Sequence, residues 1–225
     1  MILIKKSKEP QKWTEYRSTP GVDYQAIPEL VDSLLKEQGY ICAYCMRRIP
    51  TKDRVYTKDG VTFSETKEDH RVEHIKSREK HDDLKLNYTN MVICCPGHIG
   101  DEPHCDRLKG SEDISFSPLD TMFINTLSYT TDGKIESSNH AYQTEIENIL
   151  NLNTKLLMLG RKEARDEAIK NVNHLCKKNG TWNKAAIERC LAKYDNMHVN
   201  GNKKEYYPYC GIISWYLRKK LKQLS

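Results

Sequence analysis

The sequence lacks any long hydrophobic run, and no apolar stretch approaches the roughly 18 residues that a membrane-spanning helix needs. Its first residues lack the apolar region and small-residue cleavage site of a secretory signal, so we expect a cytoplasmic protein with no membrane partner. Phenylalanine is scarce, with 3 residues, but 13 tyrosines and 3 tryptophans supply aromatic groups for a core, which argues against a disordered chain. No repeat or low-complexity segment is visible, and 225 residues suffice for one large or two small domains.

An excess of charge of one sign is also nearly absent. The chain has 36 basic and 31 acidic residues, a net charge of +5, and its mean hydropathy is −0.75. This weak basic character permits a nucleic-acid partner without requiring one.

The cysteines are numerous and unevenly spaced. Eight are present, and in a reducing compartment clustered cysteines bind metals more often than they form disulfides. Cys42 and Cys45, separated by two residues, form a knuckle that can hold one metal ion from a tight turn. Candidates for the other ligands are Cys94, Cys95 and Cys105, with His98 or His104 as replacements for one of them. We expect a structural zinc ion on four thiolates, which are Cys42, Cys45, Cys95 and Cys105, and Cys94 remains an adjacent alternative.

Local patterns predict an α+β fold. Apolar spacing and a first-turn proline predict a helix over 26–38, and short β-like segments occur at 71–75 and 91–93. We also expect an extended segment over 1–25 with a strand at 2–4, a polar segment over 51–69 with a turn at Asp59-Gly60, and a helix start at 105–110. A hairpin is predicted over 123–137 around Asp132-Gly133, followed by four helices over 142–152, 154–178, 182–194 and 209–221.

Polar residues with catalytic potential lie between and beside the cysteine pairs. Glu73 and His74 are adjacent in the first β-like segment, Asn90 precedes the second, and Asp106 directly follows Cys105. This set, with Lys109 three residues after Asp106, resembles the ββα-metal motif of the HNH endonuclease family. Cys42-x2-Cys45 and the position of Cys95 match the zinc-binding subset of that family.

Further motifs resemble the PtuB-type HNH nuclease subunits of Septu and retron-associated anti-phage systems. These are Tyr88-x-Asn90-Met91-Val92, Cys95-Pro96-Gly97 and His104-Cys105-Asp106-x-x-Lys109-Gly110. The resemblance covers about residues 1–125. It implies a zinc-stapled ββα-metal nuclease domain over 1–138, and a helical region over 139–225 that docks a partner. The implied partners are an ABC/SMC-like ATPase of the PtuA type and, in some systems, a retron reverse transcriptase with its msDNA.

The chemistry of phosphodiester hydrolysis agrees with these residues. Mg²⁺ and Mn²⁺ prefer oxygen ligands, which Glu73 and Asp106 offer. We expect His74, with an ordinary pKa, to take a proton from water, and Asn90 to brace the loop or orient His74. Three basic residues are candidates for nucleic-acid contacts: Lys76, Arg78 and Lys109.

The sequence therefore favours a metal-dependent HNH endonuclease that acts on DNA within an anti-phage complex. Two alternatives remain open. One is an HNH nuclease that cleaves RNA, for example tRNA, because nothing in the motif excludes a 2′-hydroxyl. The other is a non-catalytic zinc module that binds nucleic acid or a partner.

Overall fold

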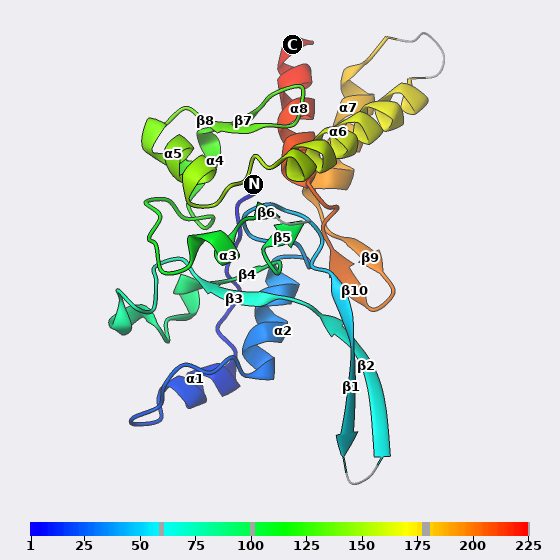
Figure 1. Ribbon diagram of the computed structural model, residues 1–225. Coiled ribbons are helices and arrows are strands. Elements are labelled where there is room, and N and C mark those ends of the chain that lie inside the picture. The colour runs from blue at the N-terminus through cyan, green and yellow to red at the C-terminus, as the bar shows by residue number, and fades with distance from the viewer. Residues whose placement is uncertain (59–60, 100–101, 177–180, 225) are drawn as a thin grey trace.

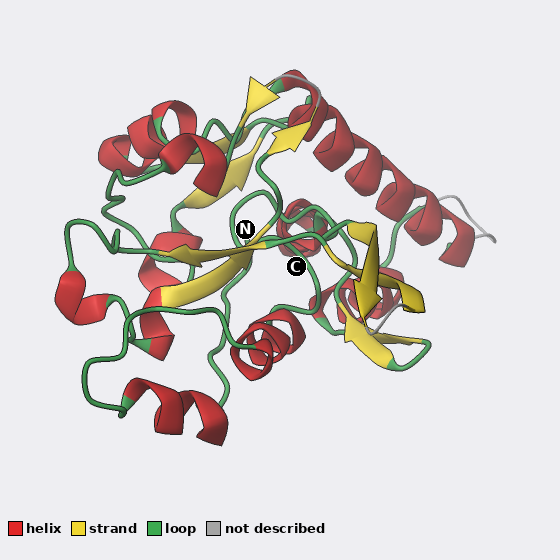
Figure 2. Cartoon of the chain, turned by 60° about the horizontal axis from the view of Figure 1, so that its bottom comes forward, coloured by secondary structure: helices red, strands yellow, loops and turns green. Residues whose placement is uncertain are grey.

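The computed structural model of the chain describes residues 1–58, 61–99, 102–176 and 181–224. Within these residues the fold is mixed α+β: its strands form five separate two-stranded antiparallel sheets, and helices follow at the C-terminal end (Figure 1). Figure 2 shows these small sheets set among helices and loops rather than joined into one layer. The α+β class with a helical C-terminal region is thereby confirmed, and no described helix is long and apolar enough to cross a membrane.

Two helices precede the first cysteine pair. The expected helix over 26–38 is confirmed as α2 (Pro28–Glu37), which begins at its proline and buries Leu30, Leu34 and Leu35. It ends before Gly39, whose φ of 55° suits the glycine that closes many helices. The prediction that residues 1–25 are extended is wrong for residues 11–17. These residues form α1 (Gln11–Arg17), which buries Trp13 completely. Residues 2–4 form no strand, although Ile4 donates a backbone hydrogen bond to Pro118 at 3.0 Å.

The polar segment over 51–69 forms a β-hairpin, whose strands the sequence did not predict. Strands β1 (Thr51–Lys58) and β2 (Val61–Glu68) pair along their whole length and extend away from the body of the molecule (Figure 1). Polar residues fill most positions of both strands in consecutive runs, so no alternation of polar and apolar residues indicates a strand. The Asp59-Gly60 turn lies outside the described residues.

The β3–β4–α3 unit contains the candidate catalytic residues. Strand β3 (Arg71–His74) pairs antiparallel with β4 (Met91–Cys94), and the short helix α3 (Asp106–Lys109) follows. The 3-10 helices η1 (Asp82–Leu84) and η2 (Tyr88–Asn90) lie in the connection between the two strands. The predicted order of two strands and a helix is confirmed, and it places Glu73 on β3 and Asp106 on α3, 33 positions later.

Short elements lie on both sides of α3 in the sequence. The loop that links the later cysteines contains the two-residue strands β5 (His98–Ile99) and β6 (Glu102–Pro103). The expected hairpin is present as β7 (Leu127–Tyr129) and β8 (Ile135–Ser137), but its first strand is shorter than predicted. Residues at its predicted start form α4 (Thr121–Asn125) instead, because Asp120 caps that helix through the Met122 N–H.

The four C-terminal helices are confirmed as α5 (His140–Asn148), α6 (Lys155–Leu175), α7 (Lys184–Asp195) and α8 (Cys210–Gln223). Thr154 and Asn183 cap α6 and α7, as their side chains predict. An unexpected hairpin of β9 (His198–Asn200) and β10 (Lys203–Glu205) joins α7 to α8. The Asn179-Gly180 stop that we expected after α6 lies outside the described residues.

The predicted boundary at residue 138 is crossed by one continuous core. Tyr209, just before α8, donates its backbone N–H to Met46 beside the cysteine knuckle at 2.9 Å. Arg161 of α6 is buried and donates to the backbone oxygens of Leu152 and Gly133. The helices therefore pack directly onto the part of the chain that contains the cysteines.

Gly133 shows how closely α6 approaches the β7–β8 turn. Its φ is 91°, and a Cβ placed there would lie 2.1 Å from the Met158 backbone oxygen. We expect Gly133→Ala to lower the free energy of unfolding by about 3 kcal/mol, through left-handed strain and overlap with α6. Gly201 is a matched control, because its φ is 60° but nothing lies within 4 Å of such a Cβ. Thermal unfolding of both variants tests this, and equal losses would contradict the close packing.

Candidate functional site

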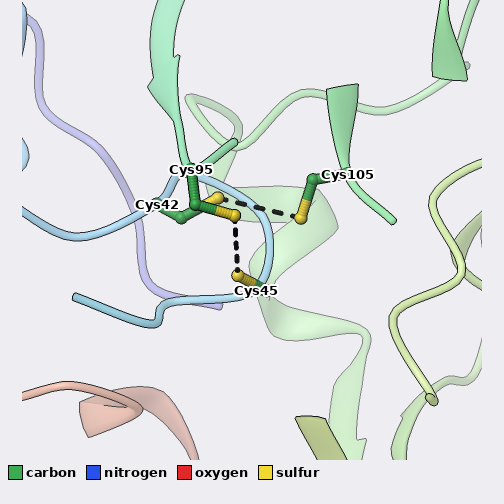
Figure 3. A group of neighbouring side chains, drawn as sticks. All are labelled: Cys42, Cys45, Cys95 and Cys105. Atoms are coloured by element: carbon green, nitrogen blue, oxygen red, sulfur yellow. Dashed lines mark hydrogen bonds between the residues drawn. The ribbon is translucent and has the colours of Figure 1, made fainter. Parts of the chain in front are cut away.

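Four cysteine side chains from three segments converge at one point. The sulfur atoms of Cys42, Cys45, Cys95 and Cys105 all lie within 4.8 Å of one another and are buried (Figure 3). The Cys42 and Cys105 sulfurs are 3.8 Å apart, and those of Cys45 and Cys95 are 3.7 Å apart. A tetrahedron with Zn–S bonds of about 2.3 Å has edges of roughly 3.8 Å, and these two spacings match such an edge.

The protonation of this cluster also favours a cation. Burial alone would raise the pKa of the Cys42 thiol, but hydrogen bonds from neighbouring thiols lower it well below its usual range. Burial raises the pKa values of Cys45 and Cys105 well above theirs. A buried thiolate among thiols is unfavourable without a cation beside it, and a bound metal ion would supply one.

The alternatives for the fourth ligand are resolved by the geometry. Cys94 is buried in β4 but does not belong to the group of four sulfurs, so Cys95 is the ligand that the structure favours. His98 is exposed and accepts a hydrogen bond from Arg107. His104 is fully buried, and its Nδ1 lies 3.2 Å from the Cys105 sulfur, so this histidine contacts a metal ligand rather than replacing one.

Backbone contacts fix the knuckle against the ββα unit. The Ala43 N–H, between the two knuckle cysteines, donates to the Ile93 oxygen of β4 at 2.9 Å. Gln38 pairs with both backbone groups of Ile93 through its amide, which satisfies the edge of β4 that β3 does not cover. The four-cysteine cluster and strand β4, which precedes Cys95, are thus held together as one unit.

A buried ion pair lies beside the cluster. The Lys109 ammonium is 2.9 Å from Glu73 Oε1, and the two side chains are 0% and 3% exposed. The Tyr44 hydroxyl, from inside the cysteine knuckle, donates to the same oxygen at 3.0 Å. Burial and the neighbouring Asp106 carboxyl raise the pKa of Glu73 to about 8, although Lys109 acts in the opposite direction.

A second ion pair completes this charged site. Arg71 Nε contacts Asp106 Oδ2, and Arg71 is more than half exposed. Arg71 and Glu73 are two residues apart in β3 and share a face of the strand. Asp106 and Lys109 are three residues apart in α3 and share a face of the helix. We call these four residues the charged quartet; they place two carboxylates next to each other and pair each with one cation.

His74 is held by a backbone carbonyl. Its Nε2 lies 2.9 Å from the Lys85 oxygen, and its ring meets Tyr24 edge-on at 4.6 Å between centroids. A carbonyl can only accept, so Nε2 carries the proton and the neutral ring has its lone pair on Nδ1. Burial lowers the pKa of His74 to about 4, with Arg78 and Lys109 acting in the same direction. The expectation of an ordinary pKa is therefore wrong, because the ring is largely removed from water.

Asn90 braces the loop after β3. Its side-chain oxygen accepts from the Lys76 N–H at 2.8 Å, and its amide donates to the oxygens of Lys76 and Leu84. Leu84 directly precedes Lys85, whose carbonyl holds His74. Of the two roles that the sequence left open, the geometry favours bracing the loop, and Asn90 affects His74 only through that loop.

The three basic candidates lie in different environments. The Lys76 ammonium donates to the Ile114 backbone oxygen at 2.8 Å. Arg78 is exposed, with its guanidinium 4.8 Å from the centre of the Tyr24 ring. Lys109 was expected at a phosphate, but its side chain is inaccessible and already paired with Glu73, so that role does not agree with its burial.

Two residues of the site were not identified from the sequence. Arg71 could have been found from the two-residue period of a strand, which places it on the same face as Glu73. Tyr44 belongs to the motif Cys42-Ala43-Tyr44-Cys45, but the sequence did not indicate its contact with Glu73, because the direction of this side chain depends on how the knuckle folds. Both contact the carboxylates directly.

Comparison with known proteins does not assign this chain. No family model matches the sequence, and no curated protein matches it significantly. Support for a function therefore comes from the residues and distances described above.

Proposed function

We propose that this chain is a zinc-stabilised, divalent-metal-dependent HNH endonuclease that hydrolyses phosphodiester bonds, with DNA as the favoured substrate. The observation that supports this most strongly is the pair of carboxylates, Glu73 and Asp106, brought together from β3 and α3. His74, which has a defined free nitrogen, directly follows Glu73 in β3, and Asp106 directly follows a cysteine of the four-cysteine cluster.

The two carboxylates fit a hard cation. Their oxygen atoms are the ligands that Mg²⁺ and Mn²⁺ prefer, and their proximity disfavours both being charged unless a cation is added. A divalent ion, when bound, would stabilise the negative charge that develops on the phosphate and lower the basicity of the leaving oxygen. Glu73 and Asp106 would hold it.

The remaining chemistry belongs to His74 and the groups around it. The Lys85 carbonyl fixes the proton on Nε2, so Nδ1 is the atom that takes a proton from the attacking water. Asn90 keeps that carbonyl in place through the loop, and Lys109 donates to the His74 backbone oxygen at 3.1 Å. The ring is thereby oriented before the substrate arrives.

The zinc cluster positions the same residues. Cys105 is a proposed zinc ligand and Asp106 is the next residue, while Tyr44 in the knuckle donates to Glu73. Cys105 has a φ of 54°, which is unfavourable for a residue with a Cβ, and its N–H is held by the Leu150 oxygen at 2.8 Å. Loss of zinc would therefore displace both carboxylates.

Within an anti-phage complex, the helical region is our proposed docking surface for an ATPase of the ABC/SMC-like kind. Two large apolar side chains near the start of α6, Leu156 and Leu159, are 43% and 45% exposed and lie three residues apart on one face of the helix. The partner itself rests on the HNH resemblance alone.

One observation favours the alternative of a non-catalytic zinc module. Lys109 and Arg71 already neutralise both carboxylates, as in an ordinary pair of structural salt bridges. Such a module would need its cysteines but not His74. The nuclease proposal differs from it in requiring His74.

Cleavage assays with Mg²⁺ or Mn²⁺ on plasmid DNA and total RNA test the proposal, with and without the ATPase. We expect His74→Ala to reduce cleavage by about 10²- to 10⁴-fold with its zinc content unchanged. His140→Ala, at an exposed position on α5, is the control and should cleave like the wild type. Cleavage of neither nucleic acid, or cleavage unaffected by His74→Ala, would contradict the proposal and favour the zinc module.

A further inference from the structure

The two cations of the charged quartet differ sharply in how firmly they are held. Lys109 is inaccessible to solvent and donates to the His74 backbone oxygen as well as to Glu73. Arg71 is 53% exposed, and its partner Asp106 is 13% exposed. Exposed ion pairs are weak and exchange readily with water, whereas a buried pair cannot open without leaving a charge uncompensated. Arg71 is thus the cation that can leave.

The charge balance of the quartet makes this difference important for metal binding. The two cations leave the quartet with no net negative charge whether or not Glu73 holds a proton, so a divalent ion approaching Glu73 and Asp106 meets no attractive field. Binding becomes favourable once one of the cations moves away from its carboxylate. Since Lys109 is fixed, the ion must displace Arg71 from Asp106.

We propose that Arg71 competes with the divalent cation for Asp106 and, once displaced, binds a phosphate group of the nucleic acid. This inference rests on the proposed function. A guanidinium is always charged, and its planar set of donors matches a phosphate as well as a carboxylate. Arg71 and Glu73 lie on the same face of β3. When the Arg71 side chain separates from Asp106, it therefore stays beside the reacting centre. Metal binding and nucleic-acid binding are then positively coupled, and the coupling is reciprocal.

The first test measures Mn²⁺ affinity of the zinc-loaded chain without nucleic acid, from the paramagnetic resonance signal of free Mn²⁺. We expect Arg71→Gln to bind Mn²⁺ about three- to tenfold more tightly than the wild type, because the competing charge is gone. Arg71→Lys retains the charge and should bind close to the wild type. Arg218→Gln removes a similarly exposed arginine from an ion pair with Asp195 and should change nothing.

The second test measures DNA affinity in a His74→Ala background, which prevents cleavage. With Mn²⁺ present, Arg71→Gln should weaken binding about three- to tenfold and reduce the salt dependence by roughly one phosphate contact. Without Mn²⁺ it should have little effect, because Asp106 then holds Arg71. Equal weakening in both conditions would identify Arg71 as a simple phosphate contact and overturn the competition.

These outcomes separate the inference from the function on which it rests. Mn²⁺ binding by the wild type that is lost in Glu73→Gln, but is unchanged or weaker in Arg71→Gln, overturns the role of Arg71 and leaves the metal site intact. Mn²⁺ binding by neither the wild type nor Arg71→Gln contradicts the metal site itself. Binding detected only in Arg71→Gln supports the competition, since the arginine then excludes the ion completely.

Discussion

Replacing Cys95 by alanine is expected to abolish zinc binding and the cooperative unfolding transition, whereas replacing its neighbour Cys94 should preserve both. Cys95 contributes one of four sulfurs with spacings of 3.7 and 3.8 Å, while Cys94 is equally buried but outside the cluster. Structural zinc sites contribute on the order of 10 kcal/mol to folding, which is comparable with the whole stability of a typical domain. The cluster joins three segments of the chain at one buried point.

The measurement is zinc content per chain by elemental analysis, combined with thermal unfolding followed by circular dichroism. We expect one zinc ion per chain in the wild type and in Cys94→Ala, whose melting temperature should fall only by a few degrees from the lost core thiol. A chelator should unfold the wild type and Cys94→Ala alike. Zinc retained in Cys95→Ala and lost in Cys94→Ala would show that the ligands are shifted by one residue.

Much of this site could be predicted from the sequence because its signals are local. Cysteine spacing identified the cluster, and the short strands at 71–75 and 91–93 and the helix start at 105–110 were each visible from a few residues. The choice between Cys94 and Cys95 needed the register of β4, since one position along a strand reverses the direction of the side chain.

What could not be predicted depended on contacts between distant segments. Helix α1 is short and gains its stability from burying Trp13. A single buried residue produces no helical periodicity, so the sequence pattern did not predict this helix. Burial, with Tyr24 packed edge-on against the ring, lowers the pKa of His74. The tautomer of His74 depends on the Lys85 carbonyl, which comes from a distant loop. Lys109 begins a polar, charged stretch of sequence, which is typical of an exposed residue. In the structure it is the last residue of the short helix α3, and its side chain is buried against β3, where it contacts Glu73 and the His74 carbonyl.

Removing Lys109 should therefore damage stability far more than the loss of a surface charge. We expect Lys109→Met to lower the free energy of unfolding by about 3 kcal/mol, because it leaves the buried Glu73 with Tyr44 as its remaining donor and frees the His74 carbonyl. For a chain of this size the melting temperature should fall by about 6–12 °C. Lys12→Met is the control, since its ion pair with Glu29 is exposed and its removal should give no measurable shift.

A double variant distinguishes a broken ion pair from simple loss of packing. Adding Glu73→Gln to Lys109→Met removes the uncompensated carboxyl and keeps an oxygen for the Tyr44 hydroxyl, so part of the lost stability should return. Stability losses that simply add would contradict the proposed coupling between Glu73 and Lys109. The sample should contain zinc on the cysteines but no Mg²⁺ or Mn²⁺. A divalent ion bound to Glu73 would supply the positive charge that Lys109 supplies in the wild type.

The pH dependence gives a further check whose sign is fixed by Glu73. Its pKa is raised from 4.5 to about 8 by burial and by Asp106, so between these values the folded chain holds a proton that the unfolded chain has released. Stability from this group is therefore full below about pH 4.5 and decreases as the pH rises toward 8. Lys109 opposes the shift, so Lys109→Met should extend this decrease to higher pH. In the Glu73→Gln variant the decrease should disappear, and its persistence there would assign it to another group.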